Sequence, residues 1–218
     1  MLVIYLWLSE AVRSRGLLAL AMTTLLAAAF DTGSAHGQAA DSPANKIEKF
    51  DDLRGEWRRN GPSFVCNVTT SRKLPPEALT PEVLSRACQH IGPFVIGQQA
   101  QALKAALGEP HRKLAGAPGQ TQLLYFLEQR EHYPYLVATV SKERIVALQV
   151  TGTSAAQGYS FNHIELGATT DTLVSYFGQP NHVEPTELKD TELWAYRPWP
   201  FTFEVNGGHV TSIRISEP

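Results

Sequence analysis

Residues 96–110 read IGQQAQALKAALGEP, and residues 166–180 read LGATTDTLVSYFGQP. The two stretches lie seventy positions apart, and a glycine, a leucine, a second glycine and a proline occupy matching places in both. The same shift carries LLYF at residues 123–126 onto LWAY at residues 193–196. Recurrence at a fixed spacing is typical of one supersecondary unit used twice, each copy burying the other's apolar face. The sequence therefore predicts a duplicated module, with one copy at residues 92–160 and the other at residues 161–218.

Each copy is predicted to hold one helix followed by three strands. The helices fall at residues 98–107 and 169–177, where Gly108 and Gly178 suit a left-handed helix end. The strands are expected at residues 122–128, 135–141 and 144–151, and at residues 192–197, 201–205 and 209–216. Asn-Gly-Gly at residues 206–208 predicts a tight hairpin turn between the last two strands. We therefore predict an α+β fold, in which two tandem helix-plus-three-strand repeats form an antiparallel sheet with both helices packed on one face.

Residues 38–91 have no counterpart in the repeat and are expected to form an N-terminal extension. They contain the two cysteines of the chain, Cys66 and Cys88. Two cysteines in an exported protein most simply form one disulfide bond, with a stabilisation of about 3 kcal/mol for a loop of this length. Thr80-Pro81-Glu82 predicts the start of a helix that carries Cys88, so the bond would tie this helix to an extended segment at Cys66.

Residues 1–37 are predicted to be a secretory signal peptide. Arg13 and Arg15 precede an apolar stretch at residues 16–30, and a tail of small residues follows. The apolar stretch is shorter than the roughly 20 residues that a membrane-spanning helix needs. Residues 1–11 lie before the basic residues, which indicates a true start codon nearer residue 12; the alternative is a longer, uncleaved anchor. We expect a periplasmic or secreted protein with no stable membrane span after cleavage.

The charge of the chain argues against two classes of partner. The formal net charge is −2, and removal of residues 1–37 leaves it unchanged because two basic and two acidic residues are lost together. A nearly neutral chain has no long-range field that attracts nucleic acid or an anionic membrane. We therefore expect no nucleic-acid partner.

No catalytic constellation is visible in the sequence. It contains no Gly-x-Ser-x-Gly, no His-Glu-x-x-His, no phosphate-binding loop and no Cys–His pattern at metal spacing. His111 and His182 follow matching Gly-x-Pro turns, so a duplicated fold could bring them together as metal ligands, although loop histidines are more often only solvated. We expect no catalytic residue, no cofactor and no metal. The alternative is an enzyme whose site is assembled from residues far apart in the sequence.

Short motifs in the second copy resemble a known family. They are Gly167-Ala168-Thr169, Phe177-Gly178-Gln179-Pro180, Trp194-Ala195-Tyr196 and Gly208-His209-Val210. This pattern resembles the β-lactamase inhibitor protein fold and the related SmpA/OmlA domain of small outer-membrane assembly lipoproteins, over residues 92–218. The first copy departs from it at Gln99, where the pattern has threonine, and the lipid-attachment cysteine of the assembly proteins is missing here. The resemblance implies binding of another protein over the sheet or its rim loops.

The predicted binding surface combines outward residues of the sheet with aromatic residues on hairpin tips. Alternation places Leu124 and Phe126 in the core and Tyr125 outside. Rigid aromatic side chains on exposed loops are favoured at protein interfaces, although these rings could instead fold back over the sheet ends. The predicted members are Tyr125, Tyr133, Tyr135, Arg197, Trp199, Glu204 and Arg214.

The sequence thus predicts an exported, non-catalytic protein-binding or scaffolding protein of the bacterial envelope, with an envelope or secreted protein as partner. One alternative is an inhibitor of a secreted hydrolase such as a β-lactamase. Further alternatives are an outer-membrane assembly factor and an enzyme.

Overall fold

The computed structural model of the 218-residue chain describes residues 53–69, 80–128 and 134–217. The predicted signal peptide and Tyr133 lie outside these ranges. Within them, no helix combines the length and the apolar character that a membrane crossing requires.

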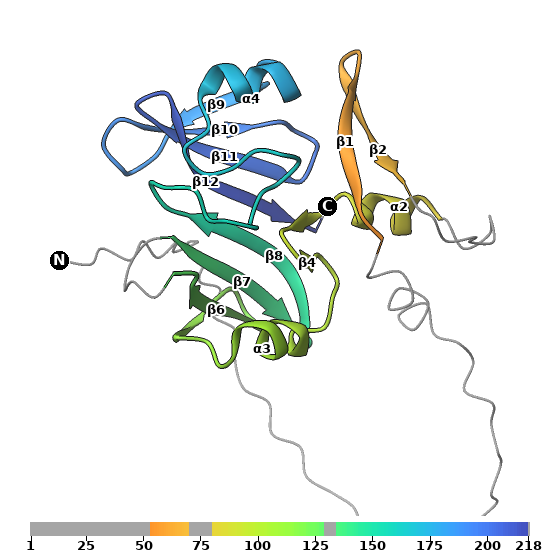
Figure 1. The fold of residues 1–218 in the computed structure, drawn as a ribbon, viewed down its shortest axis with the longest axis vertical. Coiled ribbons are helices and arrows are strands. Elements are labelled where there is room, and N and C mark those ends of the chain that lie inside the picture. The colour runs from red at the N-terminus through yellow and green to blue at the C-terminus, as the bar shows by residue number, and fades with distance from the viewer. Residues whose placement is uncertain (1–52, 70–79, 129–133, 218) are drawn as a thin grey trace, which may run out of the picture. The chain divides into compact units, whose positions relative to one another are not determined.

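An eight-stranded antiparallel sheet is the largest element of the fold (Figure 1). Its strand order is β5-β6-β7-β8-β12-β11-β10-β9. The strands are β5 (Arg112–Ala115), β6 (Gln120–Phe126), β7 (Tyr135–Ser141), β8 (Arg144–Thr151), β9 (His182–Pro185), β10 (Thr191–Ala195), β11 (Phe201–Asn206) and β12 (His209–Ser216). In the middle of the sheet, residues 147–151 of β8 pair with residues 212–216 of β12. Strands from two distant parts of the chain therefore share one ladder.

The helices are short. They are α2 (Pro81–Ala87) and α3 (Gln101–Leu107), of seven residues each, and α4 (Thr170–Phe177), of eight residues. The predicted α+β fold of two helix-plus-three-strand repeats is therefore wrong, because the described chain is mostly strand and four strands lie on each side of the β8–β12 pairing. The edge strands β5 and β9 were not predicted from the sequence. Each has only four residues, alternately half-buried and exposed, so pairing with β6 and β10 defines them and no local apolar pattern does.

Helices α3 and α4 end at the predicted residues and α4 begins next to its predicted cap, whereas α3 begins at Gln101, three residues after the predicted start. Thr169 caps α4, and its side chain accepts a hydrogen bond from the Thr172 N–H at 3.2 Å. Gly108 and Gly178 follow α3 and α4 with φ of 78° and 76°, but their ψ values of −160° and −170° differ from the predicted left-handed end; this conformation also favours glycine. The hairpin turn at residues 206–209 is also confirmed, since Gly207 and Gly208 both have positive φ.

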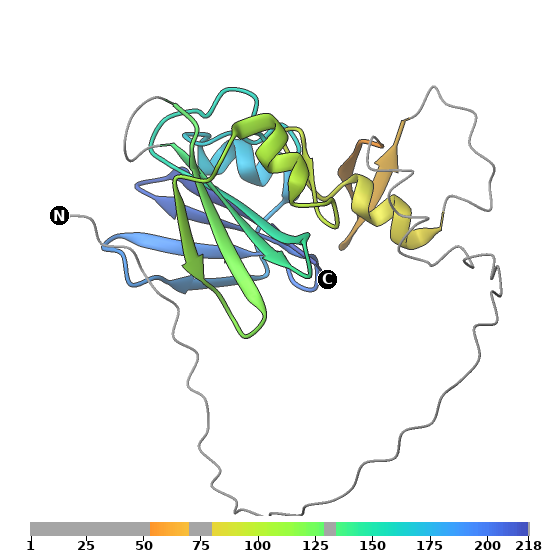
Figure 2. The ribbon, with the colours of Figure 1, turned by 90° about the horizontal axis from the view of Figure 1, so that it is seen from below.

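One face of the sheet carries the hydrophobic core. Helices α3 and α4 lie on the same side of the sheet in Figure 2, and they contribute Leu103, Leu173 and Phe177, each 2% exposed or less. The Phe177 ring lies between 5.1 and 6.0 Å from the rings of five other aromatic residues, namely Phe64, Phe161, Tyr196, Phe201 and Phe203. Full burial of each such ring contributes about 1.5–3 kcal/mol. This cluster holds α4 against β10 and β11.

The predicted faces of β6 are reversed. Tyr125 points into the core and is 1% exposed, whereas Leu124 and Phe126 belong to the opposite face. Near β10, however, Trp194 and Tyr196 pack on the core as predicted. The seventy-residue shift that matches the helices is thus off by one at this strand. Because side chains alternate with a period of two, an error of one residue moves every side chain of a strand to the other face.

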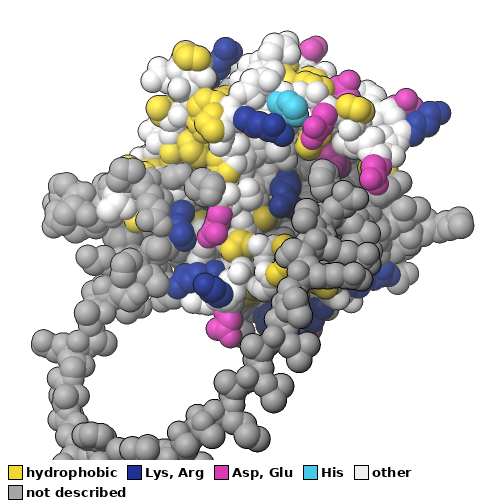
Figure 3. Space-filling view, turned by 180° about the vertical axis from the view of Figure 1, so that it is seen from behind, with side chains coloured by type: hydrophobic (Ala, Val, Ile, Leu, Met, Phe, Trp, Pro, Cys, Tyr) yellow, Lys and Arg dark blue, Asp and Glu magenta, His cyan; other side chains and the backbone are white. Residues whose placement is uncertain are grey.

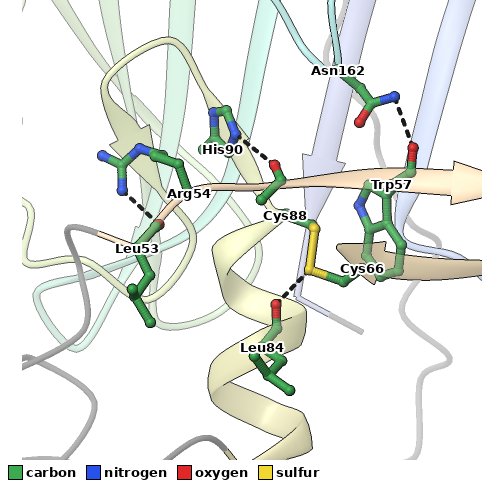
Figure 4. The surroundings of a disulfide bond; sticks show 9 residues. Leu53, Arg54, Trp57, Cys66, Leu84, Cys88, His90 and Asn162 are labelled. Carbon is green, nitrogen blue, oxygen red and sulfur yellow. Dashed lines mark hydrogen bonds between the residues drawn. A yellow bond between two sulfur atoms is a disulfide. The ribbon is translucent and has the colours of Figure 1, made fainter. Parts of the chain in front are cut away.

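The N-terminal extension contains the predicted disulfide bond. Strands β1 (Gly55–Asn60) and β2 (Ser63–Val68) form an antiparallel hairpin. Cys66 of β2 is bonded to Cys88, the residue after α2, with an S–S distance of 2.06 Å (Figure 4). A short pair, β3 (His90–Ile91) and β4 (Phe94–Val95), then leads into α3.

The extension packs on the same core as the helices. The Trp57 ring lies 6.2 Å from Phe201, and the Phe64 ring lies 4.8 Å from Trp199. The Asn162 side-chain amide donates a hydrogen bond to the Trp57 carbonyl at 3.0 Å (Figure 4). These contacts place the hairpin on the helical side of the sheet, so the hairpin leaves the opposite face of the sheet uncovered.

Candidate binding surface

The face opposite the core carries a polar cluster at the centre of the sheet. Its members come from β8, β11 and β12, and none of them belongs to the hydrophobic core. Pairing of β8 with β12 sets Gln149 opposite Arg214 and Thr151 opposite Ser212. On the other side of β12, Thr202 of β11 lies opposite Arg214, and Glu204 lies opposite Ser212. We call these six residues, Gln149, Thr151, Thr202, Glu204, Ser212 and Arg214, the central polar cluster.

Hydrogen bonds fix the inner part of the cluster. The Gln149 amide donates to the Ser212 hydroxyl at 2.9 Å, and the Thr151 and Ser212 hydroxyls lie 3.1 Å apart. Ser212 is only 2% exposed, so these bonds satisfy a hydroxyl that water cannot reach. The network therefore holds the Gln149 side chain in one orientation beside Arg214.

The outer part of the cluster carries two opposite charges. Arg214 is exposed and Glu204 is half-buried. Burial raises the pKa of the Glu204 carboxyl, and the nearby Arg214 guanidinium partly opposes this change. In the described part of the chain, neither side chain forms a hydrogen bond or an ion pair closer than 4.0 Å. Both charged groups are thus available to a binding partner.

The described surface on the rear of the molecule has mixed character. Figure 3 shows the molecule from behind, where basic, acidic and apolar side chains are interspersed on the part of the surface that is described. A protein interface of ordinary composition has the same mixture.

Three of the seven predicted surface residues are not placed on this face. Tyr125 is buried in the core, so its prediction as a surface residue is wrong. Tyr133 lies outside the described residues. Trp199 is half-buried and its ring packs on Phe64 at 4.8 Å, so it folds back over the end of the sheet, the alternative considered above.

The other four predicted residues remain accessible. Tyr135 of β7 pairs with Thr151, which puts it on the same face as Glu204 and Arg214. Arg197 is exposed just beyond β10. Thr151 and Ser212 were not among the predicted site residues. Alternation indicates that each points outward, but only the β8–β12 pairing brings them together, and no local pattern encodes that pairing.

The two histidines considered as metal ligands lie far apart. His111 precedes β5 and His182 begins β9, so they occupy opposite edges of the eight-stranded sheet. His111 Nδ1 accepts a hydrogen bond from the Phe126 N–H at 3.3 Å, and His182 Nε2 lies 3.1 Å from a Glu184 carboxylate oxygen. A shared metal site at these residues is therefore excluded. Over residues 53–69, 80–128 and 134–217, no group of three or more His, Cys, Asp or Glu side chains could hold a metal ion.

Two surface grooves lie away from the central polar cluster. A groove of about 450 Å³ between β1 and α4 is lined by Trp57, Arg58, Arg59, Ser175 and Tyr176. It contains no carboxylate, histidine or cysteine, and the Ser175 hydroxyl donates to the Thr172 carbonyl at 2.7 Å. A second groove, of about 560 Å³, lies at the β9–β10 loop and is lined by residues 185–192 with Val205, Gly207 and Gly208, none of which is histidine or cysteine. The lining of the first groove therefore offers Ser175 no carboxylate or histidine as a general base.

Comparisons with known proteins give only distant likenesses. No protein-family model matches the chain, and no curated protein matches it in sequence. The chain is similar to the structure of a DUF4309 family protein from Bacillus subtilis, with 18% identity, 56% of this chain and 79% of that chain covered, and a TM-score of 0.38. It is also similar to an extracellular protein containing an SCP domain from Bacillus anthracis, with 14% identity, 56% and 44% covered, and a TM-score of 0.40.

A third similar structure is that of a protein proposed to be a β-lactamase inhibitor, from Streptococcus mutans. It shows 15% identity, with 53% of this chain and 80% of that chain covered, and a TM-score of 0.23. All three TM-scores lie below 0.5, so we infer neither fold nor function from these likenesses.

Proposed function

We propose that this chain is an exported, non-catalytic protein of the bacterial envelope that binds another protein over the sheet face opposite the hydrophobic core, which we call the free face. The central polar cluster carries the proposal. It places the exposed residue Arg214, the half-buried Glu204 carboxylate and a fixed amide on the sheet, on the face opposite the core.

The disulfide bond supports export. Both cysteines of the chain are used in one bond, and Cys88 is 1% exposed. Disulfide bonds persist in oxidising compartments such as the periplasm or the medium and are rare in the reducing cytosol.

The chemistry of the free face supports a protein as the ligand. Arginine and tyrosine are enriched at protein interfaces, and Arg214 and Tyr135 share this face. Small-molecule sites are concave and mostly apolar, whereas this cluster is polar and lies on the open side of a sheet. A partner surface could pair with Arg214 and Glu204 while the Gln149 amide fixes its register.

Affinity capture with a charge-reversal variant tests the proposal. The exported chain is immobilised and exposed to periplasmic extract in three forms: wild type, Arg214→Glu, and the matched control Lys113→Glu. Lys113 is an exposed basic residue of the edge strand β5, so the control makes the same change of charge outside the cluster. We expect a partner retained by wild type and by the control, and lost from Arg214→Glu.

Circular dichroism must show that both variants keep the wild-type fold. Equal capture by all three proteins would contradict the role of the cluster. Absence of any partner, together with turnover of a substrate by the wild type, would favour an enzyme.

The motif resemblance favours one sharper candidate, an inhibitor of a secreted hydrolase. The motifs on which this resemblance rests include Phe177-Gly178-Gln179-Pro180 and Trp194-Ala195-Tyr196. Hydrolysis of a chromogenic cephalosporin by a purified β-lactamase should then slow in proportion to the added chain. An unchanged rate with an excess of the chain would remove β-lactamase as the target.

A further inference from the structure

The outer edge of the β1–β2 hairpin has free backbone groups. His90 Nε2 lies 3.2 Å from the Gly55 carbonyl oxygen, and Asn162 donates to the Trp57 carbonyl, so these carbonyls point away from β2. In an antiparallel pair, two directly opposite residues either form backbone hydrogen bonds with each other or both turn their backbone N–H and C=O groups away from the partner strand. Val68 and Cys66 stand opposite Gly55 and Trp57, so their N–H and C=O groups point away from β1. By alternation, those of Phe64 do the same.

In the part of the chain that the structure describes, this edge stays unpaired. Strand β2 pairs with β1 alone, in a two-stranded sheet. Phe64, Cys66 and Val68 turn their side chains toward the core and α2, and the alternate residues Ser63, Val65 and Asn67 are exposed. Val65 is 46% exposed, among the most exposed large apolar side chains of the described residues.

The two edges of the eight-stranded sheet are protected against strand addition. Edge strand β5 carries Arg112 and Lys113, and edge strand β9 carries Glu184 and Pro185. Charges and proline on an edge are the devices by which proteins prevent pairing with another chain. Strand β2 reads SFVCNV, six residues with neither a charge nor a proline. It therefore lacks the protection that the edges of the large sheet have.

We propose that the outer edge of β2 is a strand-addition surface and that its occupant is β2 of a second copy of this chain. An uncharged strand meets its own copy without like-charge repulsion, and backbone hydrogen bonds supply the attraction. The two strands run antiparallel about a two-fold axis and join the hairpins into a four-stranded sheet. This surface is separate from the central polar cluster.

The free backbone groups restrict the register of the pairing. Residues whose backbone N–H and C=O groups point away from β1 must face one another, because these groups form the hydrogen bonds between the two copies. Phe64 therefore stands opposite Cys66 of the second copy. Val65 then stands opposite Val65 of the second copy, as a non-hydrogen-bonded pair with Cα atoms about 4.5 Å apart. The alternative register, with Cys66 opposite its own copy, would set each exposed valine against Asn67. The first register buries the two valines against each other and is therefore favoured.

Sedimentation of the purified exported chain over a range of concentrations tests the dimer. We expect a monomer–dimer equilibrium in the wild type and a monomer at all concentrations in Val65→Lys, because a charge on the exposed face of an edge strand opposes pairing. The matched control is Val183→Lys, on the edge strand β9, where the side chain is 47% exposed. The control should dimerise like the wild type. A wild type that stays monomeric at millimolar concentration overturns the proposal, as does a dimer that Val65→Lys leaves unchanged.

A cysteine at the two-fold axis tests the register independently. In Val65→Cys, the two new thiols would lie within the Cα separation of 4.4–6.8 Å that a disulfide bond accepts. We expect a covalent dimer in air that forms at least ten times faster than in the control Val183→Cys. Equal rates in the two variants would refute the assigned register. Unfolding temperatures close to that of the wild type show that the variants are folded.

Discussion

Gly178→Ala should destabilise the protein, because the backbone at Gly178 is in a region that only glycine enters readily. Its φ is 76° and its ψ is −170°. A residue with a side chain held in such a conformation costs about 1–3 kcal/mol. Gly108 follows α3 with nearly the same angles, 78° and −160°. Gly108→Ala should therefore lose the same strain energy, which makes it the matched control.

The surroundings of the two glycines differ. A Cβ atom at Gly178 would lie close to the Arg59 guanidinium, whereas nothing lies within 4 Å of a Cβ atom at Gly108. Arg59 stands at the C-terminal end of α4, where a cation interacts favourably with the helix dipole by about 0.3–1 kcal/mol. The methyl group of alanine would displace it. We therefore expect Gly178→Ala to lose about 0.3–1 kcal/mol more than Gly108→Ala.

Urea unfolding followed by tryptophan fluorescence measures both losses. Each kcal/mol should also lower the melting temperature by about 2–4 °C for a domain of this size. Repeating both substitutions in an Arg59→Ala background should remove the difference between them. Unchanged stability in both single variants would refute the strain argument. A difference that persists without Arg59 would refute the assigned role of that side chain.

Two further predictions concern the disulfide bond and the half-buried carboxylate. The double variant Cys66→Ser/Cys88→Ser should lose about 3 kcal/mol in urea unfolding, because the bond closes a loop in the unfolded chain; a wild type that loses no stability on reduction would contradict this. Burial raises the pKa of Glu204 above its ordinary value of 4.5, so the folded state binds the carboxyl proton more tightly than the unfolded state does. The free energy of unfolding therefore falls as the pH rises from the unfolded-state pKa of 4.5 to the higher pKa of the folded state. Glu204→Gln should therefore be more stable than the wild type at pH 7 and lose that advantage at pH 3, as measured by urea unfolding at both pH values. An equal difference at the two pH values would show that ionisation of Glu204 is not the cause.

The candidate site could be predicted from the sequence only in part. Arg214 and Glu204 were expected outside because each alternates with apolar residues in its strand, and the structure places both on the free face. Tyr125 was misplaced because a one-residue offset between two similar segments exchanges the two faces of a strand, so that each side chain is assigned to the wrong face. Trp199 was misplaced because its packing partner, Phe64, lies more than a hundred residues away in the chain.

By itself, the sequence determined the ends of α4, the turn at residues 206–209 and the disulfide bond. The first two depend on the backbone preferences of glycine and threonine within a few residues, and a chain with two cysteines allows one internal pair. Only the tertiary structure decided the edge strands, the buried face of β6 and the β8–β12 pairing that builds the central polar cluster. These features arise from hydrogen bonds and packing between segments far apart in the chain, and such contacts leave no local pattern by which they can be predicted.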